Sequence, residues 1–166
     1  MTTSDELLGT SIVRVAGAPG RAKLVDLPLT PQQVPMGVRD EVAEHYGLAE
    51  GQFEPMATTL DYLVGATVAC LSGTLGGRLG AIGQSTANGR LTAEGRGALV
   101  VDGGVIRVRA IHVAYTLTLD DDVDEAKVRR AHETHARYCP IARSIGGCIE
   151  ITSEITVRNG RDVRNG

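Results

Sequence analysis

Two cysteines carry the most reactive side chains of this 166-residue sequence. Cys70 lies in a long, almost uncharged run, and Cys139 stands directly before Pro140. A thiolate attacks peroxides and disulfides, so a pair of thiols can undergo reversible oxidation. For either cysteine taken alone, the common alternative is a buried residue that packs as a small apolar side chain. If the chain has a chemistry, its residue types therefore indicate thiol chemistry.

Two histidines and an arginine lie near Cys139 at helical spacing, namely His132, His135 and Arg143. Positive charge beside a thiol lowers its pKa, so these neighbours predict an activated Cys139. Together with Cys139, the two histidines also place three possible metal ligands on one helix face. No second group of cysteines or histidines in the sequence completes a tetrahedral set. A metal centre is therefore the weaker hypothesis, and we expect neither a metal nor an organic cofactor.

Cys70 belongs to a predicted helix over residues 58–82. After the first turn of this helix, Arg78 is its single charged residue. Thr58 and Asp61 fit the capping box that opens many helices. Asp61 precedes Cys70 by nine residues, half a turn out of phase, so it should not face that thiol within one subunit. The five glycines of this helix predict a closely packed neighbour, because each glycine costs about 1 kcal/mol in a helix interior. The predicted face around Cys70 is a shallow groove of small and apolar residues: Leu63, Ala66, Thr67, Gly73, Thr74 and Gly77.

The rest of the sequence predicts strands and one further long helix. The expected elements are strands at 11–15 and 21–29, a loop at 30–35, a short helix at 39–46, a hairpin over 90–118 that turns at 102–104, a helix over 123–144 that kinks or restarts at Pro140, and a strand at 148–157. Strands linked as hairpins are typical of antiparallel sheets. We therefore expect one α+β domain over residues 1–166, with its core at about 9–157, in which antiparallel sheets pack around two central helices.

The composition excludes several classes of function. The net charge is -3 and the only dense basic stretch is residues 127–130, so nothing indicates nucleic-acid binding. No run reaches the roughly 18 apolar residues of a membrane span, and the polar, acidic N-terminus is unlike a signal peptide. Three widely spaced cysteines are not a disulfide framework. We expect a cytoplasmic chain with free thiols, among which Cys148 is interpreted as core or incidental.

Two segments together resemble the OsmC/Ohr family of osmotically inducible and organic hydroperoxide resistance proteins. The segment from Thr58 to Cys70 (TTLDYLVGATVAC) resembles the family's acidic residue, apolar run and cysteine on a central helix. The segment from Tyr138 to Ile145 (YCPIARSI) resembles the Cys-Pro-x-Ser motif on the family's second helix. The order of the elements agrees over roughly residues 9–157.

The resemblance implies an intertwined homodimer with both cysteines at the subunit interface. It implies a cysteine-based peroxidase of the oxidative stress response that reduces organic hydroperoxides, with Cys70 as the attacking thiolate and Cys139 as the resolving thiol. A dithiol or a lipoylated protein would be the reductant, and no metal or haem would be needed. A catalytic arginine and an acidic residue are also implied; the candidates are Arg39 and Asp61, with Arg21 as the alternative arginine.

Two positions depart from the family's pattern. Leu60 stands ten residues before Cys70, where the characterised peroxidases carry glutamate, and Ala142 stands where the second motif has serine. The missing glutamate favours a second hypothesis, a non-enzymatic member of the same fold that senses redox state or binds a small molecule. Turnover of an organic hydroperoxide with a dithiol distinguishes the two.

Overall fold

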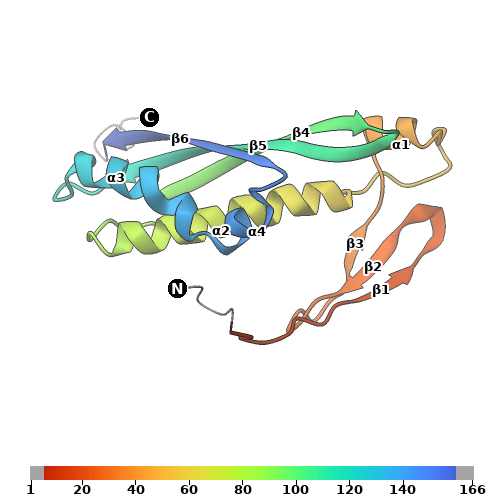
Figure 1. Cartoon of the computed structure of the whole chain (residues 1–166), viewed down its shortest axis with the longest axis horizontal. Coiled ribbons are helices and arrows are strands. Elements are labelled where there is room, and N and C mark those ends of the chain that lie inside the picture. The colour runs from red at the N-terminus through yellow and green to blue at the C-terminus, as the bar shows by residue number, and fades with distance from the viewer. Residues whose placement is uncertain (1–5, 160–166) are drawn as a thin grey trace. The chain divides into compact units, whose positions relative to one another are not determined.

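The computed structural model describes residues 6–159, and the chain divides into two compact units between Thr59 and Leu60. The first unit contains β1 (Arg14–Gly17), η1 (Pro19–Arg21), β2 (Lys23–Asp26), β3 (Val34–Met36) and α1 (Asp40–His45). From the boundary onward follow α2 (Thr59–Gly80), β4 (Leu91–Asp102), β5 (Val105–Leu119), α3 (Glu125–His135), η2 (Ala136–Tyr138), α4 (Pro140–Ile145) and β6 (Glu150–Asn159) (Figure 1). The predicted α+β class is confirmed, whereas a single domain over residues 1–166 stays a prediction.

The first unit is a three-stranded antiparallel sheet followed by a short helix. Its strand order is β1-β2-β3, so the hairpin predicted at the start of the chain is confirmed with shorter strands. Residues 34–36 form a strand where the sequence predicts a loop. Pro35 is tolerated there because β3 is an edge strand of this sheet, where a missing backbone N–H costs little. Gly47 follows α1 with a φ of 66°, the left-handed conformation typical of a helix end.

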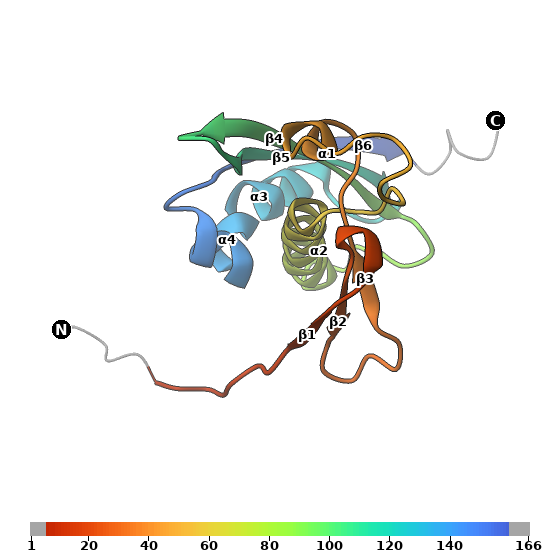
Figure 2. The same cartoon turned by 90° about the vertical axis from the view of Figure 1, so that its right-hand side faces the viewer.

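The second unit is a three-stranded sheet with α2, α3 and α4 on one face (Figure 2). β4 and β5 form the predicted hairpin, and Gly103 and Gly104 adopt φ values of 58° and 81° in its turn, as a tight hairpin turn requires. β6 instead pairs with β5 in parallel, so this sheet is mixed. The crossover through α3 and α4 makes the parallel pairing possible, and hairpin patterns in the sequence carry no information about it.

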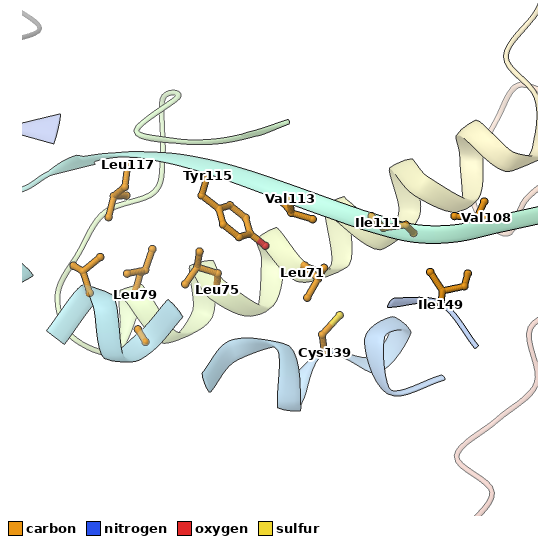
Figure 3. Packing of buried hydrophobic residues seen from close by; sticks show 12 residues of the cluster. Leu71, Leu75, Leu79, Val108, Ile111, Val113, Tyr115, Leu117, Cys139 and Ile149 are labelled. Carbon is orange, nitrogen blue, oxygen red and sulfur yellow. The ribbon is translucent and has the colours of Figure 1, made fainter. Parts of the chain in front are cut away.

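The core of the second unit lies between β5 and α2 (Figure 3). Alternate residues of β5 are buried: Ile111, Val113, Tyr115 and Leu117. Every fourth residue of α2 is buried opposite them: Leu71, Leu75 and Leu79. A strand repeats its faces every two residues and a helix about every four, so both rows face each other along their whole length.

A second face of α2 is not covered by the described residues of the second unit. We call it the small-residue stripe; its exposed members are Gly65, Ala66, Ala69, Gly73, Gly77 and Gly80. Among the described residues, Gly76 is the one glycine of this helix with a neighbour within 4 Å of an added Cβ, the Thr86 side chain at 3.7 Å. The second unit, as far as the structure describes it, therefore does not supply the close neighbour that the glycines predict. No helix within residues 6–159 is long and apolar enough to cross a membrane.

A close contact between α2 and the sheet occurs instead at two glycines of β4. A Cβ added to Gly97 would lie 2.5 Å from Cγ2 of Val64, and one added to Gly95 would lie even closer to Cγ2 of Val68. Real Cβ atoms do not approach other carbons so closely. Both positions therefore need glycine for α2 to pack against β4 at this spacing.

The predicted helix over residues 123–144 is broken into α3, η2 and α4. Asp124 caps α3, with Oδ1 accepting a hydrogen bond from the Ala126 N–H at 2.9 Å. A new helix, α4, begins at Pro140, because proline disfavours a helical conformation in the residue before it. Cys139 accordingly adopts φ -78° and ψ 119° and becomes the N-cap residue of α4. Pro140 thus places a thiol at a helix start.

A buried glutamine joins the end of α2 to the end of β5. The Gln84 amide donates to the Thr118 carbonyl at 3.1 Å and to Asp120 Oδ2 at 3.0 Å, and its oxygen accepts from the Asp120 N–H at 3.0 Å. Arg90 forms an ion pair with the same carboxylate. This network satisfies buried polar groups beyond the ends of both elements and links the two segments.

Candidate functional site

The two cysteines predicted to act together lie in contact. Cys139 donates to Cys70, and their Sγ atoms are 3.2 Å apart although 69 residues separate them in the chain. Cys70 is half-buried on α2, next to the core residue Leu71, while Cys139 is completely buried at the start of α4. Figure 3 shows the Cys139 side chain pointing toward Leu71. A covalent disulfide needs about 2.05 Å, so a small displacement would join the two sulfur atoms.

The surroundings of Cys139 favour the neutral thiol. Burial raises its pKa, the Ala142 N–H 3.5 Å away opposes this by stabilising the thiolate, and the adjacent Cys70 thiol raises the pKa further. The prediction that His132, His135 and Arg143 lower this pKa is wrong. Both imidazoles bind other partners, and Arg143 is exposed on α4. The break in the helix before Pro140 turns Cys139 away from the helical spacing on which that prediction depends.

We expect alkylation of the native protein to follow the exposure of the three thiols. Iodoacetamide should modify the exposed Cys148 first, the half-buried Cys70 second and the buried Cys139 last. Peptide mapping over a time course measures the order. Modification of Cys139 ahead of Cys70 would contradict the burial and the protonation state described here.

A hydrogen-bonded series of polar residues, Tyr115, His135 and His132, lies between β5 and α3. The Tyr115 hydroxyl is 3.1 Å from Nε2 of His135, and Nδ1 of His135 is 2.5 Å from the His132 carbonyl. A carbonyl only accepts, so Nδ1 of the neutral ring donates, Nε2 accepts, and Tyr115 must be the donor. His132 contacts Ser153 on β6 through Nε2 at 3.0 Å. Each imidazole therefore has a hydrogen-bond partner at Nε2, Tyr115 for His135 and Ser153 for His132.

The electrostatics of this series agree with the neutral forms. Burial lowers the pKa of His135; the hydrogen bond to the His132 carbonyl opposes this shift, and the charge of Arg78 adds to it. Burial also lowers the pKa of His132, helped by the adjacent His135. Burial raises the pKa of the Tyr115 hydroxyl, and the Cys139 thiol adds to that shift.

These shifts predict a loss of stability in mild acid. The unfolded chain binds a proton at each imidazole near pH 6.5, whereas the folded chain resists protonation until a lower pH. The free energy of unfolding should therefore be highest above about pH 6.5 and fall as the pH decreases through the folded pKa values. His135→Gln should flatten this slope in urea titrations between pH 7 and 5. An unchanged slope would show that His135 does not carry the effect.

Arg78 of α2 contacts Thr134 and Tyr138, and sequence reasoning did not select it as a site residue. Its guanidinium donates to Thr134 Oγ1 at 2.7 Å and lies over the Tyr138 ring, 4.9 Å from the centroid. Its Nε is buried and has no hydrogen-bond partner among residues 6–159. The available signal in the sequence is that Arg78 is the single charge after the first turn of an otherwise apolar helix.

Of the other predicted site residues, Asp61 shares α2 with Cys70, and the two candidate arginines belong to the first unit. Asp61 lies in the first turn of α2, where a carboxylate favours helix formation. Arg39 precedes α1 in the first unit and donates to Asp40 Oδ2 at 2.7 Å. Arg21 is exposed at the end of η1. Within residues 6–159, no group of three or more histidine, cysteine or acidic side chains is arranged to hold a metal, so the metal hypothesis gains no support.

Comparison with known families identifies the class of protein that this fold and thiol pair define. The model of the OsmC-like protein family matches residues 53–154, more than half of the chain, and the chain belongs to this family. The match includes Cys70 and Cys139 and excludes the first unit's sheet. The resemblance stated from the two cysteine motifs is thereby confirmed. No curated protein matches the sequence.

Solved structures share the fold at low sequence identity. The organic hydroperoxide resistance protein OhrB of Bacillus subtilis is 16% identical, with a TM-score of 0.64 over 90% of this chain and 100% of its own. An OsmC-like protein from Mycoplasma pneumoniae is 14% identical, with a TM-score of 0.68 over 91% and 99%. An OsmC-like protein of unknown function from Vibrio cholerae is 12% identical, with a TM-score of 0.73 over 90% and 100%. At these identities the comparisons show the fold alone.

Proposed function

We propose that this chain is a thiol-dependent peroxidase that reduces organic hydroperoxides through Cys70 and Cys139. The observation that carries the proposal is the contact between two free thiols, 3.2 Å apart, in a member of the OsmC-like family. The printed name of the Bacillus subtilis neighbour links that protein to organic hydroperoxide resistance. Free thiols suit a reducing compartment, so we further propose that the chain acts in the cytoplasm.

The proposed reaction has three balanced steps. The Cys70 thiolate attacks the outer oxygen of ROOH, the O–O bond breaks, and ROH leaves after protonation while Cys70 becomes a sulfenic acid. Cys139 then attacks the Cys70 sulfur, and its proton and the hydroxyl group leave as water, which forms the disulfide. A dithiol reductant attacks that disulfide, is itself oxidised to a cyclic disulfide, and returns two thiols.

The unequal burial of the two thiols supports this assignment of roles. Cys70 is half-buried and can meet a small hydroperoxide, whereas Cys139 is completely buried and its sulfur lies in contact with that of Cys70. Burial and the Cys70 thiol raise the pKa of Cys139, which favours its neutral form in the reduced protein. A resolving thiol needs no activation beforehand, because its target, a sulfenic sulfur in direct contact, is a strong electrophile.

The roles that we assign to residues around the Cys70 thiolate rest on the family resemblance. A thiolate among apolar groups needs a cation to offset its desolvation. We assign that role to Arg39, with Arg21 as the alternative, and a positioning role to Asp61. Leu60, which stands where the characterised peroxidases have glutamate, favours the second candidate, a redox sensor whose thiols oxidise without rapid turnover.

Steady-state turnover tests the proposal. The purified protein should consume cumene hydroperoxide continuously when dihydrolipoamide or dithiothreitol is supplied, at a rate proportional to protein concentration. The Cys148→Ser variant serves as the matched control and should be equally active. If each chain instead consumed one equivalent of hydroperoxide and no more in excess dithiol, the protein would be a redox sensor and the peroxidase proposal would be excluded.

We also propose that the protein is an obligate homodimer. Among the described residues of the second unit, none covers the small-residue stripe of α2, and large apolar side chains are exposed in the first unit, among them Ile12, Val15 and Leu29. Surfaces of this kind mark interaction sites. Light scattering at micromolar concentration should give twice the mass of one chain. The Gly73→Leu variant, which places a large side chain in the middle of the stripe, should have a lower measured mass than the wild type. A monomeric wild type would exclude the dimer.

A further inference from the structure

A cavity separate from the thiol pair lies between the end of α2 and the first half of α3. It has a volume of about 500 Å³, which is within the usual range for small-molecule sites. Its lining residues are Arg78, Ala81, Ile82, Asp124, Ala126, Lys127, Arg130 and Ala131. Neither Cys70 nor Cys139 is among them, and Arg78 is about 12 Å further along the axis of α2 than Cys70.

The charged groups of this cavity are unbalanced. Three cations line it, Arg78, Lys127 and Arg130, and in the part of the chain that the structure describes none of them forms an ion pair with a carboxylate. The single acid of the lining, Asp124, already accepts a hydrogen bond from Ala126 as the cap of α3. A concave surface with excess positive charge attracts anions, and its walls concentrate the field.

Arg78 supplies a second, independent observation. Its Nε is buried without a hydrogen-bond partner, although the rest of the guanidinium is held by Thr134 and the Tyr138 ring. A buried, unsatisfied donor of a charged group is costly, and native structures retain few of them. An acceptor oxygen on a bound ligand would offset that cost.

The remaining walls are apolar. Ala81 and Ile82 follow the end of α2, and Ala126 and the buried Ala131 belong to α3. A purely hydrated anion gains nothing from such walls, whereas an alkyl chain gains free energy from the apolar surface that it covers. The chemistry of the lining therefore matches a ligand with one anionic head and a short apolar chain.

We propose that this cavity is a binding site for an amphipathic carboxylate. The carboxylate lies between Lys127, Arg130 and Arg78, and the alkyl chain covers the alanine and isoleucine side chains. This site goes beyond the proposed peroxidase and does not depend on it, because binding needs no thiol and no peroxide.

Calorimetry with decanoate on the full-length chain tests the site in the reduced protein. Decanoate should bind with one site per chain, whereas acetate, inorganic phosphate and decanol at the same concentration should not bind. Lys127→Gln and Arg130→Gln should each weaken decanoate binding by about tenfold, as expected for loss of a charge-assisted contact. Both residues are exposed, so these changes leave the core intact.

The matched control is Arg137→Gln, which removes an exposed arginine of η2 outside the cavity and should leave decanoate binding unchanged. Backbone amide shifts of Ala126 and Lys127 on addition of decanoate locate the site. Absence of decanoate binding would overturn the proposal. If phosphate bound as tightly as decanoate, the apolar part of the proposed site would be excluded; if decanol did so, the anionic part would be excluded. An equal loss of decanoate affinity in Arg137→Gln would show that the attraction is non-specific and overturn the site. Peroxide turnover is not a readout here, so failure of the peroxidase leaves this result unaffected.

Discussion

Cys70→Ser is expected to reduce hydroperoxide consumption to the rate of a protein-free control. Serine keeps the size of the side chain, but a hydroxyl is not ionised near neutral pH and does not attack the O–O bond. Cys139 does not replace the missing thiolate, because it is completely buried and its pKa is raised. Consumption of cumene hydroperoxide with dihydrolipoamide, followed over time, measures the effect.

Cys139→Ser should behave differently in the same assay. The Cys70 thiolate is still present, so the first equivalent of peroxide is consumed, but no resolving thiol lies 3.2 Å away to form the disulfide. The sulfenic acid should be trapped by dimedone and should over-oxidise with repeated dosing. Cys148→Ser, which removes an exposed thiol, should match the wild type. Equal residual activity in the Cys70 and Cys139 variants would contradict unequal roles.

The second large effect is expected from Gly97→Ala, which should destabilise the protein by about 1–3 kcal/mol, the usual cost of overpacking. The new methyl group would lie 2.5 Å from Cγ2 of Val64. A valine on a helix has one strongly preferred rotamer, so the helix and the strand must separate. Urea unfolding at a fixed protein concentration measures the loss.

The control for this prediction removes the side chain on the other side of the contact. Val64→Ala costs some stability alone, but in the Gly97→Ala background it should recover stability, because the space that it vacates accommodates the new methyl group. The double variant should therefore be more stable than the sum of the single changes predicts. Additive losses would show that β4 and α2 are not in the contact described here.

Much of the fold follows from local patterns in the sequence. A local hydrophobic pattern predicts β5, whose apolar residues alternate. Local steric rules predict the hairpin turn at Gly103 and Gly104 and the helix restart at Pro140. The parallel pairing of β6 does not follow, because it depends on a crossover and on no pattern within the strand. Within the second unit the close approach lies at Gly95 and Gly97 of β4, whereas a close neighbour at the glycines of α2 stays a prediction, since composition indicates that backbones meet and not which ones do.

The candidate site could be predicted only in part. Cys70 and Cys139 were paired by their resemblance to family motifs, because a separation of 69 residues leaves no spacing rule to connect them. The partners of His132 and His135 do not follow from the sequence, because a wheel of one helix carries no information about Tyr115, which is buried on β5 and contacts His135. The cavity beside Arg78 depends on how α2 and α3 pack, and the sequence offered only an isolated charge.

The measurement that tests the central claim most directly is the intact mass of the wild-type protein after one equivalent of cumene hydroperoxide in the absence of reductant. The account predicts a loss of two hydrogen atoms per chain, and peptide mapping should locate one disulfide between Cys70 and Cys139. Dihydrolipoamide should restore the original mass. A protein that stays fully reduced after prolonged exposure, or a disulfide that includes Cys148, would contradict the proposed thiol pair.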